Sequence, residues 1–502
     1  MPERPNVVVI MADQMKASAS HVYGNRFCTT PSLARLARMG TTFDRAYTPQ
    51  PLCVPARVSL WTGRWPHAHG ARLNETPMPA GERHAFRIWH EAGYSLGLIG
   101  KNHCFHDAAD LALFDIWCEI GHEGLAPGAQ PRGMPWVRPV AAIAAAHAER
   151  RAMPRQAAAV SYARSDVDPR DASSGLIAAQ TEAYLERQAA VERPFALWVS
   201  FPDPHTPYQV PHAYAELVPP ATVELPSAPD PDAADLPERT RVLRQLLGID
   251  DASEEDRRAL VATYHAMVRF VDEGVGRILD ALERTGLARR TVVVFCSDHG
   301  DFAGEHGMTR KGGAFYDCLV RVPLLVAWPG RLPAGAVDDS PVNLVDLVPT
   351  LLRLQGLAAP AAMQGRPLPT VTEAAPREAT FAEYGAGGAP CTRADLAALA
   401  EPRGLEAAKA TLRWREAEGR RKMVRTRRHK LVTDPMGDLD ELYDLEADPG
   451  ELRNLARVPG YETLIADLRA RLFAWAVTTE DARALPLPEP APERSERSRA
   501  TT

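Results

Sequence analysis

The chain has 502 residues, of which 45% are hydrophobic and 24% are charged, and its formal net charge at pH 7 is −6. This composition is typical of a globular protein and excludes a disordered chain. Because 58 basic residues nearly balance 64 acidic ones, no strong field favours nucleic acid or an anionic membrane, and neither is an expected partner.

The longest apolar run near the start covers residues 7–12 and stops at Asp13, which is too short for a signal sequence or a membrane span. We therefore expect a cytoplasmic protein. The cysteines are odd in number and form no C-x-x-C pair, which argues against a disulfide framework and a structural zinc site. They are Cys28, Cys53, Cys104, Cys118, Cys296, Cys318 and Cys391.

Four short apolar runs predict buried parallel strands, and polar side chains follow each run within a few residues. The runs cover residues 6–12, 95–99, 195–201 and 291–296, and the polar residues are Asp13, Gln14, Lys101, His103, Asp203, His205, Asp298 and His299. Ligands bind at the carboxyl ends of strands in open α/β sheets, so these side chains can meet in one place. One such residue alone more often ends a strand as a turn or cap residue. Four occurrences in one chain favour a site.

Helices are predicted between the strands, from Thr30-Pro31 to Gly40 and, more strongly, over residues 254–284. The alternation of strands and helices predicts a parallel sheet covered on both faces. Stretches rich in Pro and Ala at residues 126–170 and 218–237 read as insertions or lid-like loops without chemistry of their own.

A smaller second domain is predicted after a linker at residues 358–376. Its strand candidates cover residues 380–384 and 423–432, and an amphipathic helix is expected near residues 462–476. The expected boundaries are a catalytic α/β domain at 1–375, a C-terminal α+β domain at 376–485 and a disordered tail at 486–502.

One stretch points to chemistry: Leu52-Cys53-Val54-Pro55-Ala56-Arg57-Val58-Ser59-Leu60-Trp61-Thr62-Gly63-Arg64. A cysteine followed by proline can be a buried structural residue at a helix start, or a thiolate nucleophile favoured by a helix N-terminus. The full C-x-P-x-R-x-x-L-x-T-G-R pattern is more specific than either interpretation. It resembles the signature of the sulfatase family, in which this cysteine is oxidised to formylglycine.

The resemblance extends over most of the chain. Family-like segments occur at residues 6–14, 297–300, 304–307, 321–324, 429–431, 441–445 and 448–451. It implies an alkaline-phosphatase-like fold: an α/β protein with a large mixed, mainly parallel sheet between helices and a smaller C-terminal α+β domain. It also implies a formylglycine-generating maturation enzyme as a partner and a small-molecule sulfate ester as the substrate. A homo-oligomer is left open.

The resemblance further implies one divalent metal ion, held by Asp13, Gln14, Asp298, His299 and an oxygen of modified Cys53. Such an oxygen-rich site suits Ca²⁺, Mg²⁺ or Mn²⁺. Many family members carry Asp in place of Gln14 and Asn in place of His299. These departures resemble choline sulfatases and phosphonate monoester hydrolases, and they make Mn²⁺ a rival to Ca²⁺.

The same resemblance assigns catalytic roles. One hydroxyl of hydrated formylglycine at position 53 attacks sulfur, and the other expels sulfate from the resulting hemiacetal. Arg57 holds the nucleophile, Lys101 and His103 serve the diol and the base step, and His205 and Lys311 contact the sulfate and the leaving oxygen. Asn74 is a candidate substrate contact, although a turn role is about equally favoured.

Three functions are therefore weighed. The leading one is the hydrolysis of a sulfate ester, which needs fixed cations and a divalent ion to neutralise the charge of the transition state. The nearest rival is a phosphonate monoester or phosphodiester hydrolase with the same nucleophile and metal. The Lys101-x-His103 pair favours the sulfatase. The third is a metal-binding pseudoenzyme, which the complete set of candidate residues disfavours.

Overall fold

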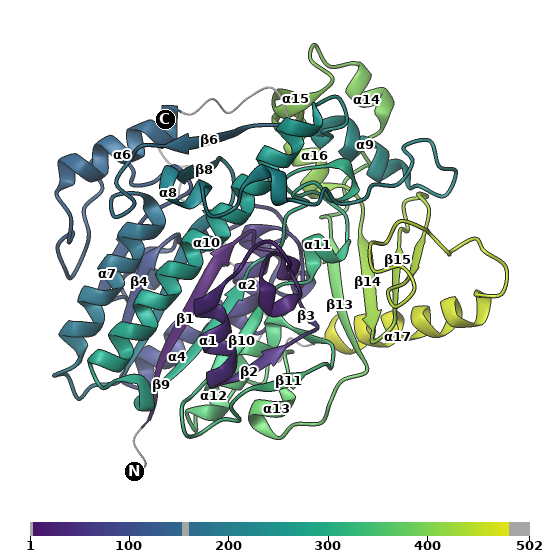
Figure 1. Cartoon of the computed structure of the whole chain (residues 1–502). Helices are drawn as coiled ribbons and strands as arrows, with labels where there is room; N and C mark the ends of the chain where they lie inside the picture. Colours follow the sequence, from purple (N-terminus) through teal and green to yellow (C-terminus); the bar gives the residue numbers. More distant parts are fainter. Residues whose placement is uncertain (1–3, 153–159, 481–502) are drawn as a thin grey trace, which may run out of the picture.

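The computed structural model describes residues 4–152 and 160–480, and an eight-stranded sheet lies at the centre of its larger part (Figure 1). Its strand pairings are parallel except for those of β10 (Leu324–Ala327), which are antiparallel. In spatial order the strands are β11 (Ala336–Asp338), β2 (Thr41–Phe43), β10 (Leu324–Ala327), β9 (Thr291–Ser297), β1 (Asn6–Asp13), β7 (Phe195–Pro204), β4 (Ser95–Gly100) and β5 (Ile116–Glu119). The expected mixed, mainly parallel sheet is confirmed, and the four predicted strands are β1, β4, β7 and β9.

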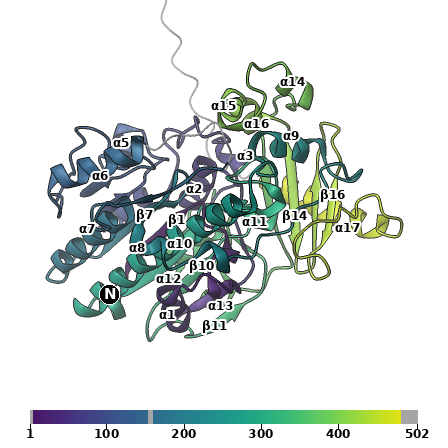
Figure 2. The same ribbon diagram turned by 45° about the horizontal axis from the view of Figure 1, so that its top comes forward.

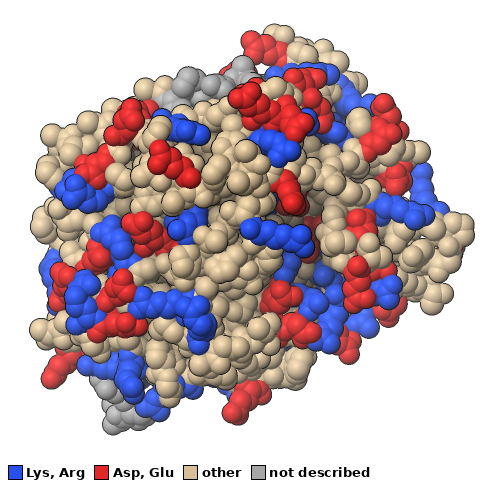
Figure 3. Space-filling model, in the orientation of Figure 1, with Lys and Arg blue, Asp and Glu red and all other residues tan. Residues whose placement is uncertain are grey.

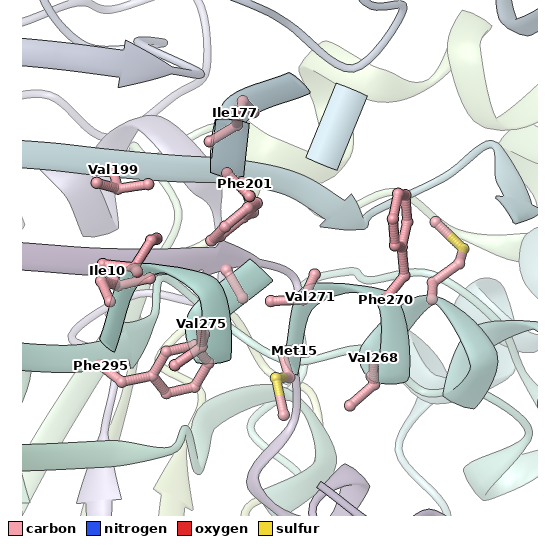
Figure 4. Close-up of a cluster of buried hydrophobic side chains, with 14 of the residues drawn as sticks. Ile10, Met15, Ile177, Val199, Phe201, Val268, Phe270, Val271, Val275 and Phe295 are labelled. Carbon is pink, nitrogen blue, oxygen red and sulfur yellow. The ribbon is translucent and has the colours of Figure 1, made fainter. Parts of the chain in front are cut away.

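Helices cover both faces of this sheet because its central strands are apolar on both sides. All eight residues of β1 are buried, and Ile10 packs on one face while Val9 packs on the other. The first face carries α1 (Pro31–Met39), α7 (Ser173–Gln188) and α10 (Glu254–Arg284); the second carries α2 (Cys53–Thr62), α4 (Ala85–Glu91) and α12 (Leu347–Leu354). Figure 4 shows Val271 and Val275 of α10 against Ile10 and Phe295.

A separate antiparallel sheet lies beside the large one (Figure 2). It consists of β13 (Ala379–Tyr384), β14 (Arg421–Thr426), β15 (His429–Thr433) and β16 (Glu441–Asp444), and α17 (Glu462–Glu480) packs on it. The single strand predicted at 423–432 is wrong, because the chain reverses at Arg427 and Arg428 and forms a hairpin. The small C-terminal α+β unit is thus present, while the domain boundaries remain predictions and the tail at 486–502 lies outside the described residues.

The insertion predicted at residues 126–170 contains regular structure: α6 (Val140–Ala152) and β6 (Tyr162–Ser165), which pairs with β8 (Tyr208–Pro211). The region 218–237 holds one short 3₁₀ turn, Pro220–Thr222. The remaining elements are β3 (Ala46–Tyr47), β12 (Val342–Asn343), α3 (Pro66–His69), α5 (Ala108–Leu111), α8 (His212–Ala215), α9 (Glu238–Leu247), α11 (Asp317–Val320), α13 (Pro369–Thr372), α14 (Arg393–Ala397), α15 (Gly404–Ala410) and α16 (Leu412–Ala417).

The surface agrees with the near-neutral composition. Acidic and basic side chains are interspersed over the face drawn in Figure 3, with no extended area of one sign. Within residues 4–152 and 160–480, none of the helices combines the length and apolar character that crossing a bilayer requires.

Candidate active site

Four adjacent strands, β9, β1, β7 and β4, bring their polar ends to one centre. Asp13 is the last residue of β1, Lys101 follows β4 and Asp298 follows β9. Gly100 makes the close approach of β4 and β7 feasible: its φ is +113°, and a Cβ there would lie 2.0 Å from the carbonyl oxygen of Ser200. The Lys101 amide donates to that same oxygen at 2.8 Å. The convergence expected from the carboxyl ends of the strands is therefore present.

Cys53 reaches this centre as the first residue of α2. The helix is buried throughout, and its amino end places partial positive charge next to the sulfur. The Val54 amide donates to Asn74 Oδ1 at 3.2 Å, which fixes the first turn beside Cys53. The sulfur lies 3.8 Å from Asp13 Oδ1 and 3.1 Å from His299 Nε2.

Asp13, Cys53, Asp298 and His299 form a buried cluster that fits a divalent cation. One ligand-type atom from each lies within 4.8 Å of every other. The His299 Nδ1–H donates to the Gly300 carbonyl at 2.9 Å, so Nε2 is the ring nitrogen that faces the cluster and would bind the metal. Two buried carboxylates and an imidazole nitrogen in one place are a suitable donor set for a divalent metal.

Gln14 lies at the edge of this cluster with a φ of 67°, which is unusual for a residue other than glycine. Its Nε2 donates to Asp301, whose carboxylate also accepts from the Tyr208 hydroxyl at 2.7 Å. These contacts fix the orientation of the amide, and Gln14 Oε1 points inward and accepts from Lys311 Nζ at 2.7 Å. The amide oxygen is therefore presented to the centre, as the predicted ligand role needs.

Arg57 holds the two carboxylates of the cluster in place. Its Nε donates to Asp298 Oδ2 at 2.9 Å, and Nη2 lies 3.4 Å from Asp13 Oδ2. Nη1 donates to Ser200 Oγ at 3.0 Å and to the Lys101 carbonyl at 3.1 Å. Since the side chain is fully buried, removing it would leave the Asp298 carboxylate without its arginine partner and Asp13 with Lys101.

The balance of charge at the centre favours anions. Burial raises the pKa of the Cys53 thiol, but Lys101, Lys311 and His299 outweigh burial and hold this pKa well below its ordinary value. For Asp13, burial is likewise opposed by Lys101, which contacts the carboxylate, and the pKa is lowered to about 2. These groups therefore favour the thiolate form of unmodified Cys53.

His205 and Lys311 form a hydrogen-bonded pair. The His205 Nδ1–H donates to the Thr206 carbonyl at 2.6 Å, so its Nε2 accepts from Lys311 Nζ at 2.9 Å. Burial and the charge of Lys311 lower the pKa of His205 to about 4, and the ring is neutral at pH 7. Lys311 keeps its charge, because Cys53 and Asp13 overcome the effect of burial and raise its pKa.

His103 also reaches the centre, with a φ of 53° and a position close enough to Cys53 to lower the thiol pKa. Asn74 differs from the other predicted residues. Its Nδ2 donates to Glu416 Oε1 at 3.0 Å while its Oδ1 accepts from Val54, so both ends of the amide are bound within the protein. A substrate contact by Asn74 remains a prediction.

Sequence reasoning did not find three residues next to the site: His122, Asp301 and Glu416. His122 follows β5, so the rule of polar residues after strands applies to it, but β5 is half exposed and shows no continuous apolar run. Asp301 lies two residues beyond His299, in a segment already considered. Glu416 comes from α16, far along the chain, and no local pattern connects it with Asn74.

The large mixed sheet and the smaller antiparallel sheet define an alkaline-phosphatase-like fold, and the buried Asp, Cys and His cluster lies where its strands converge. The profile of the Sulfatase family matches residues 5–357, and the chain belongs to this family of sulfate ester hydrolases. It is 30% identical to the choline-sulfatase of Rhizobium meliloti, over 95% of this chain and 88% of that protein. It is 27% identical to the Delta 4,5-hexuronate-2-O-sulfatase of Bacteroides thetaiotaomicron, over 95% and 90%. Among solved structures, the phosphonate monoester hydrolase of Agrobacterium radiobacter is similar, with a TM-score of 0.72, 25% identity and coverage of 95% and 96%.

Proposed function

We propose that this protein hydrolyses a small-molecule sulfate ester after Cys53 has been oxidised to formylglycine by a maturation enzyme. The observation that carries the proposal is the placement of Cys53 among Asp13, Asp298 and His299, with Lys101, Lys311 and Arg57 around them. A cysteine needed only for packing has no reason to lie among so many charged groups. The motif around Cys53 and the family membership support the same reaction.

The residues of this chain have separable tasks in the proposed reaction. Asp13, Gln14, Asp298 and His299 would hold the divalent ion, which when bound polarises the ester oxygens and the nucleophile. Hydrated formylglycine supplies a nucleophilic hydroxyl that cysteine lacks. Arg57 keeps the carboxylates in place, and Lys101 and His103 lie on the side of the nucleophile.

Lys311 is the candidate donor to the leaving oxygen. It carries the proton for the leaving oxygen, while neutral His205 accepts another N–H of the ammonium group at Nε2 and thereby orients it. For the ion itself we propose Ca²⁺, with Mn²⁺ as the alternative that the imidazole of His299 favours.

A second candidate is the hydrolysis of phosphonate monoesters or phosphodiesters. Two observations favour it: the Gln14 and His299 pair, and the similarity to a phosphonate monoester hydrolase. Sulfuryl and phosphoryl transfer require similar positioning and charge neutralisation. The presence of Lys101 and His103 in the site favours the sulfatase reaction.

The test combines mass spectrometry with kinetics. In active protein the tryptic peptide of residues 46–57 is expected to carry an aldehyde at position 53 and to resist thiol alkylation. A parallel panel of an aryl sulfate, a phosphonate monoester and a phosphodiester decides the substrate class. Phosphonate hydrolysis faster by orders of magnitude in kcat/KM would refute the sulfatase assignment, and full activity with unmodified Cys53 would refute the formylglycine mechanism. Cys53→Ala is the inactive control for both.

A further inference from the structure

His122 lies against the site although the predicted residues do not include it. It occupies a turn after β5 that is closed by two backbone hydrogen bonds between Gly121 and Gly124, each 3.0 Å long. The imidazole lies on the ring of His205, with 3.7 Å between ring centroids and 34° between the planes. Its Nδ1 lies 3.7 Å from Asp13 Oδ2, beside the predicted metal ligands.

One ring nitrogen of His122, Nδ1, has no hydrogen-bond partner among the described residues. Nδ1 is buried without a partner, while 23% of the side chain is open to solvent. A buried polar atom without a hydrogen-bond partner costs free energy, and in a native protein it calls for an explanation, such as a ligand that forms the missing hydrogen bond.

The position of His122 is built by the surrounding structure. Arg150 of α6 donates from Nε to the His122 carbonyl and from Nη2 to Asp203 Oδ1, the latter at 2.9 Å. Ser174 Oγ donates to the other oxygen of Asp203 at 2.5 Å. Asp203 lies two residues before His205, so one buried arginine ties the His122 turn to the strand that presents His205. The insertion that carries α6 therefore contributes to the site.

We propose that His122 is a substrate-binding residue of this site, whose ring N–H donates to an oxygen of the anionic ester headgroup. This inference rests on the proposed function, since it takes the headgroup to bind at the Cys53 centre. An imidazole N–H suits the oxygens of an anionic ester, because it adds a hydrogen-bond donor beside Lys101 and Lys311. The alternative is that His122 only supports the ring of His205.

Two substitutions separate these roles. His122→Phe keeps an aromatic ring against His205 and removes both nitrogens, whereas His122→Gln keeps an N–H donor and removes the ring. We expect the Phe variant to raise KM about tenfold to a hundredfold, the usual effect of one hydrogen bond to a charged group, with a smaller change in kcat. The Gln variant should recover at least part of this loss. His106→Phe, a substitution of an exposed histidine on the same side of β4, is the matched control.

The second readout is the binding of inorganic sulfate, measured by titration calorimetry without turnover. Binding should weaken in the Phe variant by the same factor as KM increases, and the control variant should match the wild type. Equal sulfate binding and equal KM in wild-type and Phe proteins would overturn the inference, as would a Gln variant more impaired than the Phe variant. If the Phe variant does not fold, an increase in KM of more than a hundredfold in the Gln variant decides against hydrogen-bond donation by the His122 ring.

Kinetics are measured with whichever ester the wild-type protein hydrolyses fastest. A preference for phosphonate monoesters would then refute the sulfatase assignment while the comparison of His122 variants still applies, with inorganic phosphate as the binding probe. A failure of the sulfatase assignment and a failure of the His122 inference therefore give different results.

Discussion

Replacing Asp298 by asparagine tests the metal site most directly. The carboxylate is fully buried, and both of its oxygens accept hydrogen bonds from N–H groups. Oδ1 accepts from the backbone amides of Gln14 and His299 at 3.0 and 2.9 Å, and Oδ2 accepts from Arg57 Nε at 2.9 Å. An asparagine side chain must turn its NH₂ group toward one of these donors. The substitution therefore removes both a charge and a hydrogen bond, whichever way the amide is oriented.

The size of the effect follows from these contacts. Breaking a buried ion pair by removing one partner costs about 3–5 kcal/mol, and the lower end applies here because Arg57 retains Asp13 at 3.4 Å. Altering a residue that only orients a metal ligand already lowers metal affinity about 10–100-fold, so the loss of a ligand charge is expected to exceed a hundredfold. Activity should fall at least in proportion.

The assay measures metal content by mass spectrometry after dialysis against defined free metal, alongside kcat/KM and urea unfolding. Asp272→Asn is the matched control, because Asp272 is a buried carboxylate that accepts the Ser32 and Leu33 amides at the start of α1, away from the site. It should lower stability and leave metal content unchanged. Unchanged metal content and rate in Asp298→Asn would remove Asp298 from the site.

Three further outcomes are expected. In protein made without the maturation enzyme, Cys53 should be alkylated faster at pH 7 than Cys104, because burial raises the pKa of the Cys104 thiol. Peptide mass spectrometry measures both alkylation rates, and equal rates would contradict a Cys53 thiolate. Burial raises the pKa of Glu416 to about 7 from 4.5, so between these pH values the folded state holds a proton that the unfolded chain releases. The free energy of unfolding of the wild type should therefore fall as pH rises from about 4.5 to 7, by on the order of 3 kcal/mol relative to Glu416→Gln, measured by urea unfolding. Arg150→Met should raise KM through displacement of His122, and an unchanged KM would show that the turn holds its position without Arg150.

The parts of the fold that sequence reasoning recovered are those with strong periodic signals. The apolar runs of β1 and β9 and the long stripe of α10 depend on burial, which a local pattern records. The hairpin of β14 and β15 was missed because its turn consists of Arg427 and Arg428, which carry neither the glycine nor the asparagine that indicates a tight turn.

The same contrast holds for the site. Residues that directly follow a buried strand or lie in the Cys53 motif were found from the sequence, since their spacing along the chain determines their place. Glu416 and Arg150 act through contacts with residues 342 and 53 positions away, and such pairs leave no local signal. The charge of each was visible in the sequence, but its partner was not.

The charges of the centre also connect maturation with ligand binding. Lys101, Lys311 and His299 favour the thiolate form of Cys53, and Arg57 and Lys101 contact the carboxylates of Asp298 and Asp13. Conversion of Cys53 to an aldehyde would remove the one negative charge that is not a carboxylate, and the centre would then favour an anion more strongly. Unconverted protein should therefore bind inorganic sulfate more weakly than converted protein at the same metal content. On this argument the oxidation does more than create a nucleophile, because it also removes the charge that would repel the ester.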